Sequence, residues 1–214
     1  MCGAIHQEFE SPTLRLYKNV IILNKKEGET PLEALEKFRR KHKEYKEAKI
    51  TYAGRLDPMA KGVLVLLAGE ETKNKEKYLG LDKEYEFEVL FGFSTDTYDI
   101  LGKISYSDIL KNLEMSELEK LTKKNLKFFV GEFTQAYPAY SSKAVKGRQL
   151  WQYARGGEDV ESQSREVSVK NLKFLGIRKI TAKKLLTNIE KRIGKVNGDF
   201  RQEEILKIWK KNLA

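Results

Sequence analysis

The sequence predicts an α+β fold with a mixed, largely antiparallel central sheet flanked by helices. Three observations lead to this class. Apolar side chains alternate with glutamates along Lys83–Phe93, which is the period of a half-buried strand. Two apolar runs, Val20–Leu23 and Val63–Leu67, have the composition of short buried strands, and we expect the second to be buried on both faces. Helix-start signals between and after these runs place helices in the same chain.

The order of the elements begins with a segment that has no clear periodicity, Met1–Tyr17. A chain of 214 residues is most often one domain. We therefore expect a loosely held lead-in over residues 1–18 and a single domain over residues 19–214. The chain is long enough to bury a substantial core without disulfides.

Helix boundaries are indicated by capping residues. Thr30–Glu33 places Thr at the N-cap, Pro at the first helical position and Glu at the third. Asn74–Leu79 is expected to be a short helix, and Ser116–Glu119 is a second capping box that opens another. Glu166–Phe174 has the composition of a strand, and Gln202–Trp209 begins a final helix.

The chain is strongly basic. It carries 41 Lys and Arg residues against 31 Asp and Glu residues, a formal charge of +10 and a pI near 9.4. Such a balance favours a polyanionic partner, with nucleic acid first, although charge can also serve solubility alone. The basic run Arg39–Lys43 is either a solvated helix face or a contact to phosphates.

Cysteine and histidine are scarce. Cys2 is the single cysteine, which excludes an internal disulfide and fits a reducing compartment. His6 and His42 are the only histidines, and no zinc-ligand spacing occurs, so we expect no metal. No apolar stretch approaches a membrane span, and Met1–Glu10 lacks a signal-peptide core. A soluble, cytoplasmic protein is expected.

The chain is organised around the segment Ile50–Lys73, with Asp57 at its centre. Pro58 fixes its own φ and biases Asp57 towards extended backbone, so the carboxylate lies at a bend. Gly54 and Gly62 bracket the bend, where positive φ is accessible to glycine. An Asp-Pro turn before a strand is, by itself, most often only a turn.

The whole segment resembles the catalytic segment of the TruB-type pseudouridine synthases, which reads approximately G-H-T-G-x-L-D-P-x-A-x-G-x-L and then G-E-x-T-K. The matching residues are Gly54, Leu56, Asp57, Pro58, Ala60, Gly62, Leu64, Gly69, Glu70, Thr72 and Lys73. The resemblance implies the pseudouridine synthase fold and makes Asp57 the catalytic residue. A second family motif, D-K-P-x-G-x-T-S, matches at Lys25, Gly28 and Thr30, with Lys26 where the family has Pro.

Three residues of this segment depart from the family pattern. Tyr52 stands where the family usually has His, and Ala53 where it has Thr. Arg55 precedes Leu-Asp, as in the related RluA-type synthases. We include Tyr52 and Arg55 among the expected substrate-binding residues.

Two further residues are assigned through the resemblance. The family has K-x-Y in the strand matched by Lys83–Phe93, which implies that Tyr85 stacks on the target base. A family motif T-D-T-x-D-x-x-G matches Thr95–Gly102, and its second Asp pairs with an active-site Arg. This makes Asp99 the expected orienting partner. Two carboxylates in this loop are too few for a divalent-metal cage.

The C-terminal half supplies the remaining candidates. Phe128–Lys143 resembles G-x-x-x-Q-x-P-P-x-Y-S-A-x-K, which adds Tyr140 and Lys143 to the substrate-binding set, with Lys143 one place early. A family strand of the form K-G-T-Y-I-R supplies an Arg that meets the catalytic Asp. Lys195–Gln202 is similar, with Arg201 one residue early. Because one residue turns a strand side chain to the other face, a bulge or helix start must re-aim Arg201.

The resemblance implies a tRNA pseudouridine synthase without a cofactor, which isomerises a flipped-out uridine in the T arm of tRNA. Two alternatives stay open: a synthase for another structured RNA, and a catalytically silent RNA-binding or chaperone protein of the same fold. We expect a monomer without membrane or metal partners. The family usually continues into a small PUA-type domain, and we expect no such domain in this protein.

Overall fold

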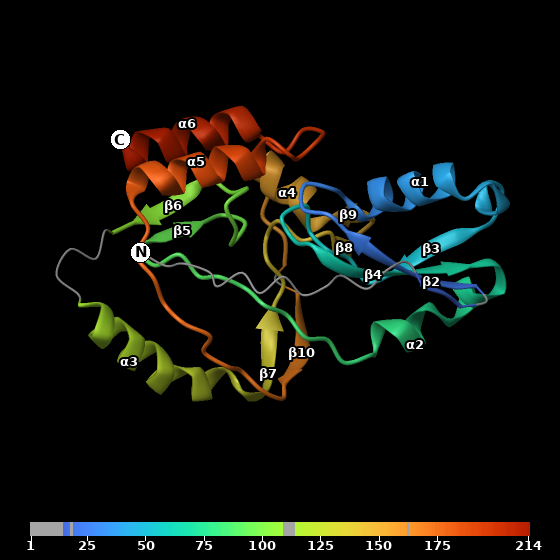
Figure 1. The fold of residues 1–214 in the computed structure, drawn as a ribbon, viewed down its shortest axis with the longest axis horizontal. Coiled ribbons are helices and arrows are strands. Elements are labelled where there is room, and N and C mark those ends of the chain that lie inside the picture. Colours follow the sequence, from blue (N-terminus) through green and yellow to red (C-terminus); the bar gives the residue numbers. More distant parts are fainter. Residues whose placement is uncertain (1–14, 18, 109–113, 162) are drawn as a thin grey trace. The chain divides into compact units, whose positions relative to one another are not determined.

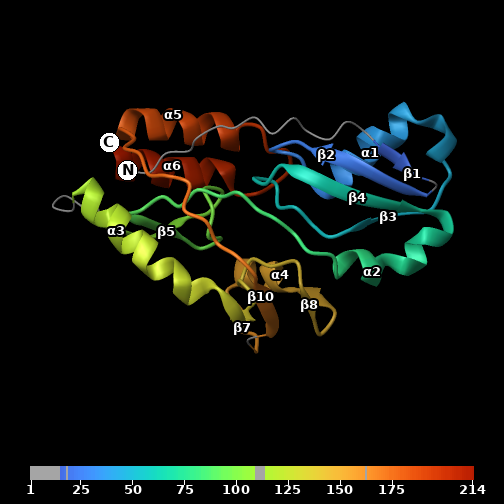
Figure 2. The same cartoon turned by 60° about the horizontal axis from the view of Figure 1, so that its bottom comes forward.

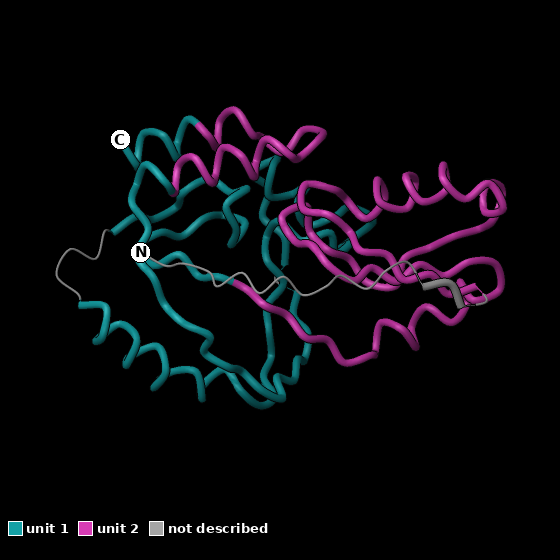
Figure 3. Tube along the Cα trace, in the orientation of Figure 1, with its two compact units in different colours: residues 1–5, 88–184, 207–214 teal, residues 6–87, 185–206 magenta. Residues whose placement is uncertain are grey.

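The computed structural model describes residues 15–17, 19–108, 114–161 and 163–214. These residues divide into two compact units, coloured separately in Figure 3. Unit 2 takes the described residues up to 87 together with Leu185–Leu206, and unit 1 takes Glu88–Lys184 and Lys207–Ala214. The unit that contains Asp57 is therefore completed by a segment close to the C-terminus.

Unit 2 is built on a four-stranded antiparallel sheet with the strand order β1-β2-β4-β3 (Figure 1). These strands are β1 (Arg15–Tyr17), β2 (Val20–Lys25), β4 (Gly62–Ala68) and β3 (Ile50–Ala53). β4 pairs with β2 on one side and β3 on the other, so both apolar runs of the sequence form strands as predicted. Within the expected lead-in, Arg15–Tyr17 pair with β2.

Helix α1 (Pro31–Lys41) covers one face of this sheet. Thr30 Oγ1 accepts a hydrogen bond from the Glu33 N–H at 3.2 Å, and Glu33 Oε2 accepts one from the Thr30 N–H at 2.7 Å. This capping box satisfies two N–H groups that a helix start leaves unpaired, and it confirms the predicted start. The core between helix and sheet consists of Ile21, Ala34, Leu35, Phe38, Leu64, Leu66 and Ala68.

The central strand β4 is buried along the face that packs on α1, whereas on its other face only Leu67 is buried, so the predicted burial on both faces is limited to the end of the strand. Leu64 and Leu66 face α1, whereas Leu67 points to the opposite face and is also fully buried. Val63 is 53% exposed, so burial begins one residue later than the sequence predicted.

The remaining elements of unit 2 are short or shared with unit 1. A 3-10 helix at Lys43–Tyr45 follows α1, and another at Gly69–Asn74 leads into α2 (Lys75–Leu79), which confirms the short helix predicted there. Helices α5 (Ala182–Ile193) and α6 (Gln202–Leu213) each contribute residues to both units. The final helix is thus confirmed.

Among its described residues, unit 1 contains three two-stranded antiparallel sheets, two whole helices and parts of α5 and α6. The pairs are β5 (Phe93–Thr95) with β6 (Ile104–Ser107), β7 (Gly131–Ala136) with β10 (Ser164–Val169), and β8 (Ala144–Val145) with β9 (Arg148–Gln149). Helix α3 (Met115–Asn125) runs into a 3-10 helix at Leu126–Phe129, and α4 (Leu150–Gly156) follows β9 (Figure 2).

The C-terminal half of α6 packs on the β5–β6 pair within unit 1. The ring centroid of Trp209 lies 5.3 Å from that of Phe93, and the Trp209 Nε1–H donates to the Ile100 carbonyl at 3.2 Å. Trp209 is only 1% exposed, and its indole N–H therefore has the partner that a buried donor requires.

The α+β class is confirmed, but the strands among the described residues form four separate antiparallel sheets instead of one central sheet. The half-buried strand expected at Lys83–Phe93 is wrong, because only Phe93 is in a strand, Phe91 and Gly92 form a turn, and residues 83–90 have no regular secondary structure. Tyr85 and Phe87 are 65% and 64% exposed. Residues 170–174 likewise lie outside β10. Alternation specifies a pleated backbone, whereas a strand also needs a neighbour to bond.

The capping box predicted at Ser116 is also wrong. Helix α3 begins at Met115 with Glu114 as N-cap and no side-chain capping bond. Ser116 is already helical, whereas an N-cap residue needs non-helical backbone. None of the helices in the described residues is both long and apolar enough to cross a membrane.

Candidate active site

Asp57 lies on the turn that joins β3 to β4 in unit 2. The Ala60 N–H donates to the Asp57 carbonyl at 2.9 Å and closes the turn. Met59 at its centre is 9% exposed, whereas the side chain of Asp57 is exposed. The turn is therefore anchored by an apolar side chain and presents its carboxylate to solvent.

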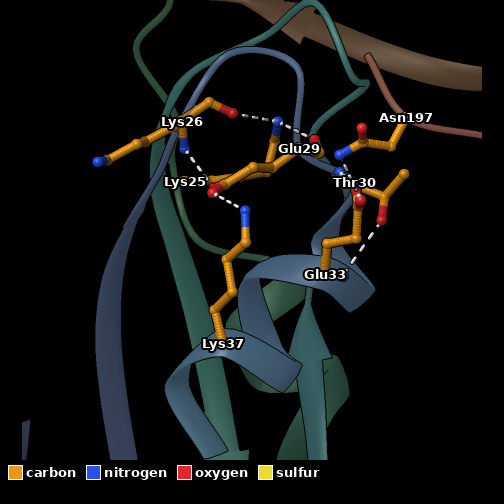
Figure 4. Close-up of polar contacts among 7 residues, drawn as sticks. All are labelled: Lys25, Lys26, Glu29, Thr30, Glu33, Lys37 and Asn197. Carbon is orange, nitrogen blue, oxygen red and sulfur yellow. Dashed lines mark hydrogen bonds and ion pairs between the residues drawn. The ribbon is translucent and has the colours of Figure 1, made fainter. Parts of the chain in front are cut away.

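Lys25, the last residue of β2, is a cation buried next to this turn. It is 0% exposed, and its Nζ donates to the carbonyls of Lys26 at 3.1 Å and Glu29 at 2.5 Å (Figure 4). Burial lowers the pKa of Lys25 below its ordinary value, although Glu29, and after it Asp57, act to raise it. Asp57 is therefore close enough to interact electrostatically with this ammonium group.

The loop after β2 is tied directly to the Asp57 turn. The Gly28 N–H donates to the Pro58 carbonyl at 2.7 Å. Gly28 has φ +91°, and a Cβ there would lie 2.5 Å from the carbonyl oxygen of Lys195. Glycine is thus required both by the backbone conformation and by the close approach of the C-terminal segment.

Gly28→Ala is expected to destabilise the protein more than Gly54→Ala. Gly54 also has positive φ, +97°, but its Cβ would meet nothing within 4 Å. We expect Gly54→Ala to cost about 1–2 kcal/mol from backbone strain alone, and Gly28→Ala to cost about 1–3 kcal/mol more from overpacking. Urea denaturation measures both. Equal losses of unfolding free energy in the two variants would show that Lys195 does not restrict the side chain at position 28.

Arg201 lies in the turn that leads from α5 into α6. This turn, residues 194–201, belongs to unit 2, as does Asp57. Arg201 has φ +63°, a left-handed conformation that non-glycine residues seldom adopt. Its N–H donates to Asp199 Oδ1 at 3.2 Å, and Gln202 Nε2 donates to the Gly198 carbonyl at 2.7 Å. A bulge or a helix start was expected to redirect the Arg201 side chain. Arg201 has a left-handed backbone conformation and directly precedes helix α6. Its pairing with Asp57 stays a prediction.

Tyr52 and Arg55 flank the Asp57 turn on its β3 side. Tyr52 pairs with Leu66 of β4 and is packed partly against the core of unit 2. Arg55 is exposed, two residues before Asp57. Tyr52 therefore has a packing role, and substrate contact by either residue stays a prediction.

Tyr85 precedes unit 1 on an extended segment and is 65% exposed. Because the side chain is exposed, the faces of its ring are accessible to a base. The predicted stacking role therefore does not require Tyr85 to lie in a strand.

Asp99 is held within a polar loop of unit 1. Its Oδ1 accepts hydrogen bonds from Thr97 Oγ1 and the Leu101 N–H, both at 2.8 Å, and its carbonyl accepts from Thr95 Oγ1 at 2.7 Å. The T-D-T-x-D motif thus has a local structural role as the cap of a tight loop. The expected ion pair between Asp99 and an active-site Arg stays a prediction.

Tyr140 and Lys143 lie between β7 and β8 of unit 1. Lys143 Nζ lies 5.5 Å from the ring centroid of Tyr137, and the guanidinium of Arg165 lies 5.5 Å from the same ring. Two cations on one aromatic ring form a basic and aromatic surface of the kind that binds single-stranded RNA. Tyr137 was not among the substrate-binding residues expected from the sequence.

No role in the site was predicted for Lys25 from the sequence. A signal was available, since Ile21, Leu23 and Lys25 alternate along β2 and place the lysine on the inward face. No group of three or more His, Cys, Asp and Glu side chains in the described part of the chain is arranged to hold a metal ion.

Comparison with known proteins places these features in a family. Residues 40–195 match the family model described as TruB family pseudouridylate synthase (N terminal domain). The chain is 42% identical over 127 residues to the tRNA pseudouridine synthase B of Caldanaerobacter subterraneus subsp. tengcongensis, a match covering 59% of this chain and 43% of that protein. It is 34% identical to the protein of the same name from Aquifex aeolicus over 157 residues, 72% of this chain and 51% of that protein. The corresponding protein of Borreliella burgdorferi (strain ZS7) is 36% identical over 156 residues, 72% of this chain and 52% of that protein. The chain thus spans about half the length of these relatives.

Proposed function

Because the chain belongs to the TruB family of pseudouridylate synthases, we propose that it isomerises uridine to pseudouridine in the T arm of tRNA. The observation that carries this proposal is the family match over residues 40–195, which includes an exposed Asp57 on an anchored turn. The relatives' printed name supplies the tRNA. We also propose the pseudouridine synthase fold for this α+β chain, with residues 19–214 as one catalytic domain in a cytoplasmic monomer.

The reaction breaks the bond between N1 of uracil and C1′ of the ribose and forms a bond from C5 to C1′. The proton on C5 is released to solvent, N1 gains a proton, and no oxidant or reductant is consumed. Asp57 acts on the ribose as nucleophile or base while the uracil rotates, so its carboxylate has to be ionised. The exposure of Asp57 on an anchored turn supports this role, because its carboxylate is accessible to a ribose.

Other residues have proposed roles in holding the nucleotide and orienting the carboxylate. The target base has to leave its stack to be reached, and Tyr85 is exposed and available to stack on it. Arg201 orients Asp57, with Asp99 as the partner of the arginine. Tyr140 and Lys143, which belong to the basic and aromatic surface around Tyr137, contact the RNA, as do Tyr52 and Arg55.

The experiment that tests the function is tritium release from a tRNA transcript labelled at C5 of its uridines. We expect release by the wild-type protein, mapping to one uridine of the T loop. Binding without release from tRNA, together with release from an rRNA fragment, would assign the chemistry to another RNA. Binding without release from any RNA of the panel would identify an RNA-binding protein.

RNA affinity is expected to fall steeply with salt, because the net charge of +10 favours contacts to phosphates. Neutralising two phosphates already predicts a loss of about tenfold between 50 and 200 mM salt. Fluorescence anisotropy with a labelled T-arm hairpin measures the slope. An affinity that does not change over this range would exclude phosphate contacts as the main source of binding.

A further inference from the structure

Glu27 connects two segments that are far apart in the sequence. Its Oε1 accepts a hydrogen bond from Arg192 Nε, and its Oε2 accepts one from Lys195 Nζ at 2.5 Å. The partners follow Glu27 by 165 and 168 residues. The carboxylate therefore joins the loop after β2 to the end of α5.

This pair of contacts differs from an ordinary surface ion pair. The side chain of Glu27 is only 16% exposed, and both of its oxygens are used. Burial alone would raise the pKa of Glu27, but the hydrogen bonds from Lys195 and Arg192 outweigh it and lower the pKa. The group is thus a carboxylate at neutral pH, and two charge-assisted bonds fix its position.

The loop that carries Glu27 touches both parts of the proposed active site. The next residue, Gly28, donates to the Pro58 carbonyl, and its Cα packs against the backbone of Lys195. Arg201 follows Lys195 by six residues. Glu27 and Gly28 therefore stand between the Asp57 turn and the segment that ends at Arg201.

A second contact supports the same arrangement. Asn197 Nδ2 donates to Glu33 Oε1 at 3.2 Å, while the other oxygen of Glu33 caps α1 (Figure 4). Gln202 Nε2 then closes the turn on the carbonyls of Val196 and Gly198, at 3.1 and 2.7 Å. The turn is thereby held at its beginning, middle and end.

We propose that Glu27 is a positioning residue for the isomerisation, which holds the Arg201 turn in register with the Asp57 turn. This proposal rests on the proposed function. Because Glu27 reaches the reacting atoms only through these turns, its loss is expected to affect kcat more than RNA binding.

The same loop provides a matched control. Glu29, two residues later, pairs with Lys37 Nζ at 2.7 Å, and this contact leads to α1 and not to the Arg201 turn (Figure 4). Lys37→Met therefore breaks an ion pair of the same loop without touching the C-terminal segment.

The kinetic test compares Glu27→Ala with Lys37→Met on a tRNA transcript, at a temperature where thermal melting shows both variants folded. We expect kcat of Glu27→Ala to fall about 10- to 100-fold, with KM changed less than about threefold, since small misplacements of reacting groups have effects of this size. Lys37→Met should stay within about twofold of wild type. Adding Arg192→Met to Glu27→Ala should lower kcat by less than about twofold more, because the contact is already lost. An equal kcat for both single variants overturns the proposal.

Hydrogen exchange provides a readout that does not depend on turnover. Amides of residues 196–201 should exchange at least about tenfold faster in Glu27→Ala than in Lys37→Met or wild type. Unchanged exchange overturns the proposal even if the wild type is active. A wild type that releases no tritium from tRNA refutes the proposed function instead, and the activity assay alone identifies that result.

Discussion

Asp57→Ala is expected to abolish tritium release from tRNA while RNA binding persists. If Asp57 forms or breaks the bond at C1′, no other group of the turn can replace it, and we expect kcat to fall at least about 10⁴-fold. The phosphate contacts do not involve this residue, so Kd for tRNA should stay within about threefold of wild type. Single-turnover tritium release and anisotropy measure the two quantities.

A control shows that the loss is specific to this carboxylate. Glu71 lies in the 3-10 helix after β4, where it accepts a hydrogen bond from Tyr78 Oη at 2.7 Å. Glu71→Gln should leave activity within about twofold of wild type, as surface substitutions generally do. Residual turnover by Asp57→Ala above a hundredth of the wild-type rate would exclude Asp57 as the reacting carboxylate.

Substitution of Arg201 is expected to have the second large effect on activity. Two variants separate the contribution of its side chain from that of its backbone conformation. Arg201→Ala and Arg201→Gly should both lower kcat about 10²- to 10³-fold if Arg201 is the charged donor that we propose for the Asp57 carboxylate. Arg201 has φ +63°, which glycine adopts without strain. The Gly variant should therefore be about 1 kcal/mol more stable than the Ala variant in urea denaturation.

These two measurements can contradict the assignment in different ways. Full activity of both variants would mean that another arginine serves Asp57. Equal stability of the two variants would mean that the left-handed backbone at Arg201 carries no strain in the folded protein.

The sequence predicted the parts of unit 2 that depend on local signals. The apolar run Val63–Leu67 and the capping box at Thr30 specify their elements through burial and through paired side-chain bonds, and both are confirmed. Asp57 was predicted at a bend because Pro58 restricts the backbone, and the structure places it on a turn.

The predictions that failed required information about neighbours. Tyr85 and Phe87 alternate with glutamates, but the pattern does not specify which strand lies beside them, and these residues are exposed and unpaired in a sheet. The contact between Glu27 and Arg192 spans most of the chain, and no local pattern indicates it. The burial of Lys25 was foreseeable from alternation, but its hydrogen bonds to two carbonyls depend on the path of the loop.

Unit 2 is formed by two segments that are far apart in the sequence, and this has a consequence for synthesis of the protein. Residues 185–206 complete the unit whose sheet is finished by Ala68. A ribosome adds about 5–20 residues per second, so roughly 8–33 s pass between translation of Glu27 and of Arg192, which are 165 residues apart. After Ala68 has been translated, the sheet of unit 2 can form during the rest of this interval, but its partners from α5 do not yet exist. The nascent chain therefore carries Asp57 before it carries Arg201, and the proposed site can assemble only after Arg201 has been translated.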